Sequence, residues 1–165
     1  MNVEMGEYVV GAYLKLELGC DVVDYNVRAP GGGRRGLQEL DVIGLDFEHR
    51  TAYLCEVATH IRGLDYGGSY DETVARISRK FVCQRDYARD YLSSFKTAHF
   101  EFWSPNVPLG ALSEKLQQIE GLDLVINTKY RDRVAVLQRR AAREFQETGN
   151  PFFRSLQILG SLRGG

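Results

Sequence analysis

Three acidic side chains on two neighbouring segments are the residues of this chain whose types and spacing could do chemistry. Residues 37–46 and 51–58 are short, rich in apolar side chains and separated by only four residues, which favours the two strands of a hairpin. Glu39 and Asp41 lie on the first segment, and Glu56 lies on the second. Glu39 and Asp41 point the same way, because side chains two positions apart on a strand share a face.

The register of this hairpin decides whether the acids meet. With residues 47–50 as the loop, Asp41 lies opposite Glu56 and Glu39 lies opposite Ala58. Opposed side chains are about 5 Å apart at Cβ, and carboxylates at that distance raise each other's pKa unless a cation lies between them. Mg²⁺ or Mn²⁺ meets this need and supports phosphodiester hydrolysis. The alternative is an exposed hairpin whose polar residues face water.

The rest of the chain supplies the elements that must position these acids. The spacing of apolar residues predicts helices at 3–18, 71–93 and 129–147, and a shorter one near 111–120. Further strands are expected at 21–28, 99–104 and 122–127. This order is typical of an α/β domain with a central mixed sheet of about five strands flanked by helices. We expect the domain at 1–148, and at 149–165 a C-terminal tail with one more helical turn from Pro151.

Composition excludes several classes of protein. The chain has 165 residues, of which 44% are hydrophobic and 26% charged, as in globular rather than disordered or collagen-like proteins. Three cysteines without a CxxC pair argue against a disulfide framework or a zinc site, and favour the cytoplasm. No apolar run approaches the roughly 18 residues of a membrane span, and the N-terminal residues do not have the pattern of a signal peptide.

The net charge of −1 hides two unlike halves. Residues 1–75 carry 6 Lys and Arg against 13 Asp and Glu, a net charge of −7. Residues 76–165 carry 15 against 9, a net charge of +6. The acidic half holds the candidate metal ligands, and the basic half could steer a polyanion toward them.

The acids also belong to a longer pattern. Three segments occur in order: GEYVVGAYLKLELGCDVVDYNVR, ELDVIGLD and AYLCEVATH. Together they resemble the PD-(D/E)xK nuclease superfamily, most of all its small bacterial members similar to Holliday-junction resolvases. The resemblance covers residues 6–60 and extends more loosely to Leu92. It implies a restriction-endonuclease-like three-layer fold and metal-dependent hydrolysis of nucleic acid.

The same resemblance implies roles for individual residues. Glu7 matches the glutamate of the first helix, Asp41 the metal-binding aspartate and Glu56 the glutamate of a Glu-x-Lys motif. Val57 would offer its backbone carbonyl to the metal. Ala58 departs from the pattern, because it stands where the family has a lysine that positions the attacking water. Three explanations stay open: the lysine's role has moved, the protein binds without cutting, or the alanine is an introduced replacement.

Lys80 is the candidate for the moved lysine. It lies four residues before Gln84 on the expected helix 71–93, so the two share a face. The resemblance supports both as catalytic residues, since related nucleases often place a Lys or Gln on this helix. The alternatives are a lysine that extends to the surface and a solvated amide.

Four further residues are candidates for contact with nucleic acid. They are Arg34 and Arg35 in a Gly-rich loop, His60 after the motif and Arg79 on the helix 71–93. Basic side chains of this kind position a phosphate backbone and do not read sequence. The alternative for each is a solvated side chain.

These observations favour a Mg²⁺- or Mn²⁺-dependent nuclease acting on DNA rather than RNA, with branched or structured DNA as one option. A homodimer is also an option, and no membrane partner is expected. The first rival is a catalytically inactive protein of the same fold that binds nucleic acid or protein. The second is an unrelated α/β domain whose acids are structural.

Overall fold

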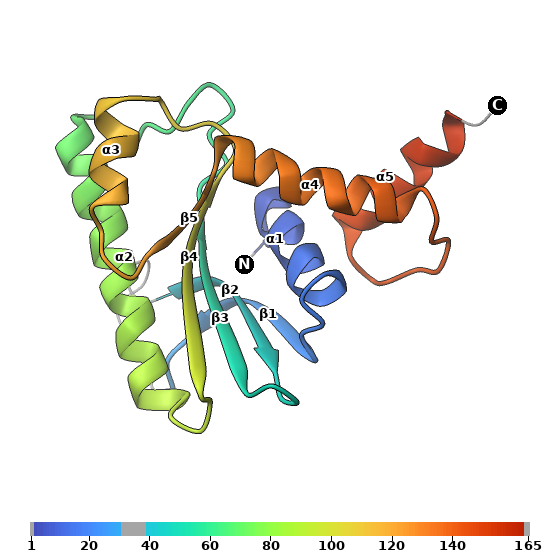
Figure 1. The fold of residues 1–165 in the computed structure, drawn as a ribbon, viewed down its shortest axis with the longest axis horizontal. Helices are drawn as coiled ribbons and strands as arrows, with labels where there is room; N and C mark the ends of the chain where they lie inside the picture. The colour runs from blue at the N-terminus through green and yellow to red at the C-terminus, as the bar shows by residue number, and fades with distance from the viewer. Residues whose placement is uncertain (1, 31–38, 164–165) are drawn as a thin grey trace.

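The computed structural model describes residues 2–30 and 39–163, and these residues fold around a five-stranded sheet (Figure 1). The strands, in their order across the sheet, are β1 (Val22–Arg28), β2 (Glu39–Asp46), β3 (Thr51–Val57), β4 (Thr97–Ser104) and β5 (Asp123–Ile126). Pairing is antiparallel between β1, β2 and β3, and parallel between β3, β4 and β5. The expected α/β domain with a mixed sheet of about five strands is confirmed.

Helices cover both faces of this sheet. They are α1 (Met5–Leu16), α2 (Tyr70–Tyr91), α3 (Ala111–Gln117), α4 (Asn127–Ala141) and α5 (Pro151–Leu162). Figure 1 shows α2 and α3 on one side of the sheet and α1, α4 and α5 on the other. The last helix is longer than the single turn expected, and it packs against α1 and α4.

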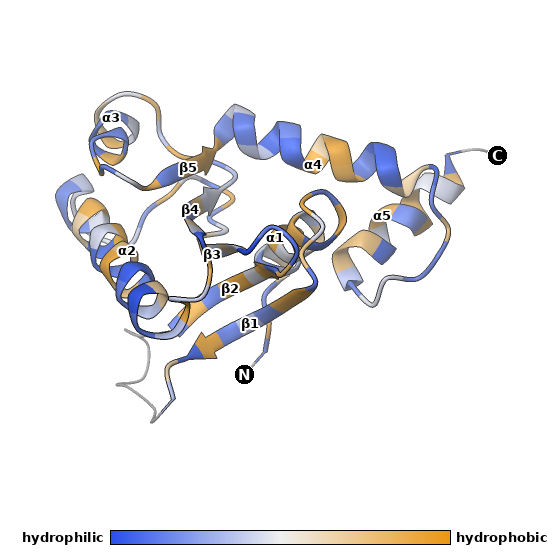
Figure 2. Ribbon diagram, turned by 60° about the horizontal axis from the view of Figure 1, so that its bottom comes forward, coloured by the Kyte–Doolittle hydropathy of each residue, from blue (hydrophilic) through white to orange (hydrophobic). Residues whose placement is uncertain are grey.

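Hydropathy and burial indicate which side of α4 and of α2 packs against the rest of the protein. Figure 2 shows a hydrophobic segment in the middle of the otherwise largely hydrophilic α4, and this part of α4 contains the buried Leu137. On α2 the buried positions are Thr73, Ile77, Phe81 and Gln84. They recur every three or four residues and therefore form one stripe along the helix, facing the sheet.

The β2–β3 hairpin has the register that the loop length predicts. Asp46 pairs with Thr51, and Val42 pairs with Cys55. One further step in this register places Asp41 opposite Glu56. Because Cys55 belongs to the core cluster under α1, its neighbour Glu56 points to the other face, toward α2.

A buried ion pair holds α4 against the sheet on the face away from α2. Glu101 of β4 is only 3% exposed and accepts three hydrogen bonds of 3.0–3.2 Å from the guanidinium of Arg133. It also accepts a bond of 2.7 Å from the indole of Trp103. The guanidinium lies 4.6 Å from the ring centroids of both Tyr13 and Trp103. The pair is therefore fully partnered, as a buried charge must be.

Removing one member of this pair should destabilise the protein strongly. We expect Arg133→Met to lower the free energy of unfolding by about 3–5 kcal/mol, because the Glu101 carboxylate would stay buried without its cation. Chemical denaturation monitored by circular dichroism measures this loss. Arg139→Met, which removes an exposed arginine of the same helix, should change stability by less than about 0.5 kcal/mol. Equal effects of the two substitutions would contradict a structural role for the pair.

Candidate active site

The start of α1 is packed against the end of β3. A Cβ atom at Gly6 would lie 1.9 Å from the Thr59 hydroxyl oxygen, so this close approach requires glycine. The next residue, Glu7, is buried, and its carboxylate accepts a hydrogen bond of 2.9 Å from the backbone N–H of Glu4. The bond closes the first turn of the helix. The sequence Gly-Glu thus brings a fixed carboxylate to the end of the sheet where Asp41 and Glu56 lie.

Lys80 of α2 lies between the two acids of the hairpin. Its ammonium nitrogen is 3.1 Å from Glu56 Oε2 and 3.8 Å from Asp41 Oδ1. It also donates to the backbone carbonyl of Glu39 at 3.3 Å. The side chains of Lys80, Asp41 and Glu56 are only 14%, 16% and 10% exposed. Three oxygens from two strands therefore surround one cation at a position that is largely shielded from solvent.

The electrostatics of this group favour a shared proton or a further cation. Burial, together with the negative charge of Asp41, raises the pKa of Glu56 to about 8. Burial also raises the pKa of Asp41, although the positive charge of Lys80 opposes the rise. Burial lowers the pKa of Lys80, but the two carboxylates outweigh it and the pKa is raised overall. At neutral pH Lys80 is thus charged while Glu56 is largely protonated.

Glu7 approaches the same group from the other face of the sheet. Burial raises the pKa of Glu7, and the negative charge of Asp41 adds to the rise. The amide of Asn26 donates to Glu7 Oε2 at 3.4 Å. Asn26 has a φ of 53°, which asparagine tolerates better than most residues. At this residue the pairing of β1 with β2 skips one step, beside Asp41, and the amide reaches Glu7.

Glu39 does not complete a cluster of three free acids. Its carboxylate accepts two hydrogen bonds, of 2.9 and 2.7 Å, from the guanidinium of Arg28 on β1. Only its backbone carbonyl meets Lys80. The hairpin's acids are therefore offset by two cations, one from β1 and one from α2.

Gln84 contacts the backbone around the site, whereas the backbone of Val57 contacts one of the two acids. The amide of Gln84 donates to the carbonyls of Leu54 at 3.1 Å and of Glu101 at 3.5 Å, so it braces β3 and β4 one turn away from Lys80. The N–H of Val57 donates to Asp41 Oδ2 at 2.8 Å and fixes that carboxylate. Ala58 is buried in an apolar cluster with Leu64.

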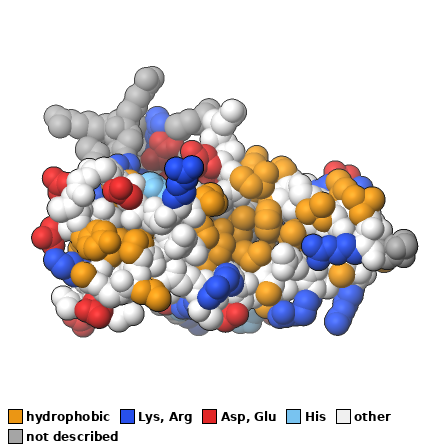
Figure 3. Space-filling view, turned by 90° about the horizontal axis from the view of Figure 1, so that it is seen from above, with side chains coloured by type: hydrophobic (Ala, Val, Ile, Leu, Met, Phe, Trp, Pro, Cys, Tyr) orange, Lys and Arg blue, Asp and Glu red, His pale blue; other side chains and the backbone are white. Residues whose placement is uncertain are grey.

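The four residues predicted to contact nucleic acid differ in where they lie. Arg34 and Arg35 lie outside the described residues. His60 contacts the ring of Tyr66, with 5.1 Å between ring centroids, on the loop that leaves the site. Arg79 is exposed on α2. On the face in Figure 3, acidic and basic side chains and a histidine gather at the end of the molecule that carries α2 and α3.

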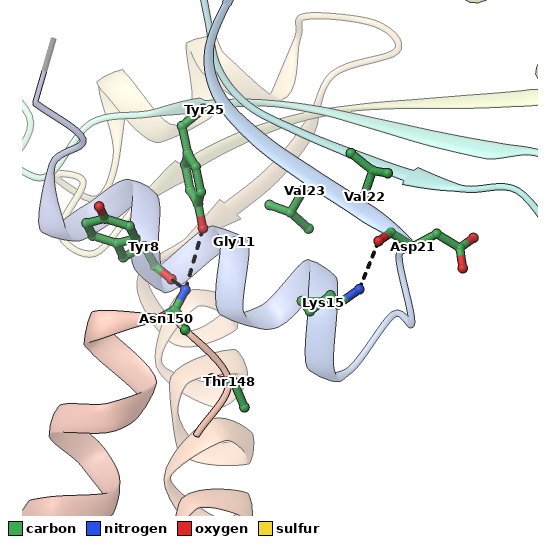
Figure 4. A pocket seen from close by; sticks show the side chains of 10 residues that line it. Tyr8, Gly11, Lys15, Asp21, Val22, Val23, Tyr25, Thr148 and Asn150 are labelled. Atoms are coloured by element: carbon green, nitrogen blue, oxygen red, sulfur yellow. Dashed lines mark hydrogen bonds between the residues drawn. The ribbon is translucent and has the colours of Figure 1, made fainter. Parts of the chain in front are cut away.

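A separate groove lies between α1, β1 and the loop before α5 (Figure 4). Its volume is about 410 Å³. The Asn150 amide spans it, donating to the Tyr8 carbonyl at 2.9 Å and to the Tyr25 hydroxyl at 3.5 Å. None of the acids around Lys80 lines this groove, and its polar contacts serve to anchor α5.

Two partners of the acids, Asn26 and Arg28, were not singled out by the sequence, and neither was Arg76, which contacts Tyr66. Asn26 and Arg28 end β1, and the only signal for them is the Asn-x-Arg pattern of the family that the chain resembles. Arg76 lies one turn before Lys80 on α2, and helical spacing from Lys80 would have found it.

No family model and no curated protein matches the chain. Within the described residues, no group of three or more His, Cys, Asp or Glu side chains is arranged to hold a metal ion. In the same part of the chain, no helix is both long and apolar enough to cross a bilayer.

Proposed function

We propose that this chain is a metal-dependent nuclease with a restriction-endonuclease-like fold, acting on DNA. One observation carries the proposal: Asp41 and Glu56, from paired strands, converge with the Glu39 carbonyl on one cation at 3.1–3.8 Å. Two carboxyl groups buried this close together need a proton or a cation between them. The resemblance to the PD-(D/E)xK superfamily assigns these same two acids to the metal.

The donor set fits a hard divalent cation. Asp41 and Glu56 would hold Mg²⁺ or Mn²⁺, with Val57 offering its backbone carbonyl, because these ions prefer oxygen ligands and retain several waters. Bound there, the ion would polarise a phosphoryl oxygen and lower the pKa of the attacking water. The ammonium of Lys80 lies between the two acids, so this position accommodates a positive charge.

The chain's own residues then divide the remaining work. Lys80 reaches the acids from α2, so its ammonium can donate a hydrogen bond to a phosphate oxygen or to the attacking water. This is the task that the resemblance gives to the lysine missing at position 58. Glu7 and Asn26 hold the edge of the site next to Asp41. His60 and Arg79 remain proposed phosphate contacts, as do Arg34 and Arg35.

The test is cleavage by the purified protein. Single-stranded, duplex and branched DNA, and the matching RNAs, are incubated with Mg²⁺, with Mn²⁺ or with EDTA. We expect metal-dependent cleavage of DNA, with branched or structured substrates the first to examine. Absence of cleavage on every substrate and with both metals would refute the proposal.

Metal binding should depend steeply on pH. Glu56, with a pKa of about 8, must lose its proton before it can hold a metal ion. The affinity for Mn²⁺ should therefore rise as pH increases from 6 to 8, by up to about tenfold per pH unit, with release of about one proton. Calorimetry in buffers of different ionisation enthalpy measures both quantities.

The same pKa fixes the sign of the effect on stability. The folded state holds the Glu56 proton more tightly than the unfolded state does. Without metal, this contribution to stability is complete below the ordinary pKa of 4.5 and is lost as pH rises through about 8. The groups that face Glu56 are Asp41, Lys80 and Tyr66.

Glu56→Gln should remove most of the proton release that accompanies binding of Mn²⁺. Unchanged proton release would assign the released proton to another group.

The second candidate function is a binding module without catalysis. The observation that favours it is Lys80 itself, because an ammonium already paired with both acids can replace the metal altogether. In that case calorimetry should detect no carboxylate-dependent binding of Mn²⁺, while binding of nucleic acid or of a protein partner persists.

A further inference from the structure

We propose that Arg76, held against the ring of Tyr66, is the group that binds the phosphate to be cut. The inference rests on the proposed function, and it adds the positive charge of Arg76 to that of Lys80. Arg76 lies one turn before Lys80, so both project from the same side of α2. Its guanidinium carbon is 4.1 Å from the centroid of the Tyr66 ring.

The ring that supports Arg76 is fixed in place. Tyr66 lies on the loop between β3 and α2 and packs on the apolar cluster that includes Ala58, Leu64 and Ile77. His60 meets the same ring, with 5.1 Å between centroids. The loop therefore carries the ring from the end of β3 to the side of α2 and leaves the guanidinium at the rim of the site.

Charge explains why a second cation is needed. The ammonium of Lys80 is already paired with Asp41 and Glu56, so a second cation at the rim would strengthen the attraction of an incoming polyanion. Arg76 is exposed, and no ion pair of the described residues includes it. A guanidinium stacked on an aromatic face keeps its N–H edges available for two parallel bonds to a phosphate.

Two electrostatic effects agree with this placement. Arg76 is near enough to Lys80 for its positive charge to oppose the rise in the pKa of Lys80. Burial, with the negative charge of Glu56, raises the pKa of Tyr66 to about 12. Tyr66 thus stays neutral at the pH of any assay, and its ring supports the guanidinium without forming a phenolate that would repel a phosphate.

The same helix provides a matched control. Arg85 is also exposed, and its guanidinium carbon lies 5.7 Å from the centroid of the Phe81 ring. It lies more than two turns beyond Arg76 toward the far end of α2. A stacked arginine of general importance for folding or solubility would thus give equal effects at both positions, whereas a phosphate contact would not.

The experiment compares Arg76→Ala, Arg76→Lys and Arg85→Ala in two assays. Binding of a fluorescein-labelled DNA oligonucleotide is measured by anisotropy with Ca²⁺ in place of Mg²⁺, and cleavage is measured as kcat/KM with Mg²⁺. We expect Arg76→Ala to weaken binding about tenfold and to lower kcat/KM about 100-fold. Arg76→Lys should recover binding in part but not turnover, because lysine cannot form two parallel bonds. Arg85→Ala should change both values less than about twofold.

Tyr66 is tested as a positioning residue. Tyr66→Phe retains the ring face and should behave like the parent, whereas Tyr66→Leu removes it and should behave like Arg76→Ala. A thermal melt of each variant shows whether it is folded. A folded Tyr66→Leu variant with parental kcat/KM would overturn the role of the ring.

The outcomes separate this inference from the proposed function. If the parent cleaves DNA and Arg76→Ala equals Arg85→Ala, the phosphate contact is wrong and the nuclease stands. If the parent binds DNA through Arg76 but cleaves nothing, Arg76 contacts a backbone phosphate that is not cut, and both the nuclease and the role of Arg76 at the cut phosphate are wrong. If the parent neither binds nor cleaves, both are wrong.

Discussion

Asp41→Asn should lower DNA cleavage about 10³-fold or more, because a metal ligand at a reacting phosphate contributes several kcal/mol to the transition state. The substitution replaces one oxygen by an NH₂ group and keeps the size of the side chain. The remaining oxygen can still accept the bond from the N–H of Val57. The buried negative charge of Asp41 disappears together with its cost of burial, so stability without metal should stay within about 1 kcal/mol of the parent. Gel assays and a thermal melt measure the two effects.

Asp46→Asn is the matched control for this substitution. Asp46 is a buried acid on the same strand, at the other end, where it accepts bonds from His49 at the hairpin turn. It is remote from Lys80, so its loss should leave cleavage unchanged once folding is verified. Equal losses at Asp41 and Asp46 would attribute the effect to the hairpin rather than to the metal site.

Lys80→Met should lower cleavage at least about 100-fold and should also make the melting temperature respond more strongly to metal than that of the parent. Methionine preserves most of the buried chain of the lysine but leaves Asp41 and Glu56 without their cation. Loss of one partner from a buried ionic group costs about 3–5 kcal/mol when the remaining charge stays. Here part of that cost is avoided, because the two carboxyl groups can take up protons. We therefore expect a clear drop in melting temperature that grows as pH rises.

Added Mn²⁺ should reverse that drop. A divalent ion bound between the carboxylates supplies the charge that Lys80 supplied, so it should stabilise Lys80→Met more than the parent. Lys115→Met is the control, because Lys115 pairs with Asp71 at the exposed junction of α2 and α3. A Lys80→Met protein that gains no stability from Mn²⁺ would argue that the acids hold no metal at all.

The hairpin and its two acids could be predicted from the sequence because the argument is local. A four-residue loop and the two-residue period of strands fix which side chains oppose each other, and Asp46 pairs with Thr51 as expected. Lys80 was found for a similar reason, since an apolar helical stripe identifies the face of α2 that meets the sheet. Each of these inferences uses only neighbours in the chain.

The partners of the acids could not be predicted because they depend on long-range register. Arg28 reaches Glu39 only because β1 pairs with β2 across the segment between them. Gln84 shares a face with Lys80, but one helical turn carries it past the acids to the carbonyl of Leu54. The same turn in the opposite direction brings Arg76 to Tyr66. The position along the axis of α2 decides what Gln84 and Arg76 contact. The pattern of residues in the sequence indicates only which face of the helix they occupy.

The burial of Ala58 has a consequence for how such a site can change. Position 58 is enclosed by Leu64, Ile77 and their apolar neighbours, while the ammonium of Lys80 already lies between the acids. A lysine introduced at 58 would place a second charge in an occupied space and would displace packed side chains. Positions 58 and 80 are therefore epistatic, since a lysine at either position reduces the space and the charge compensation available to a lysine at the other. A change of Ala58 to lysine would therefore call for a change at position 80 as well.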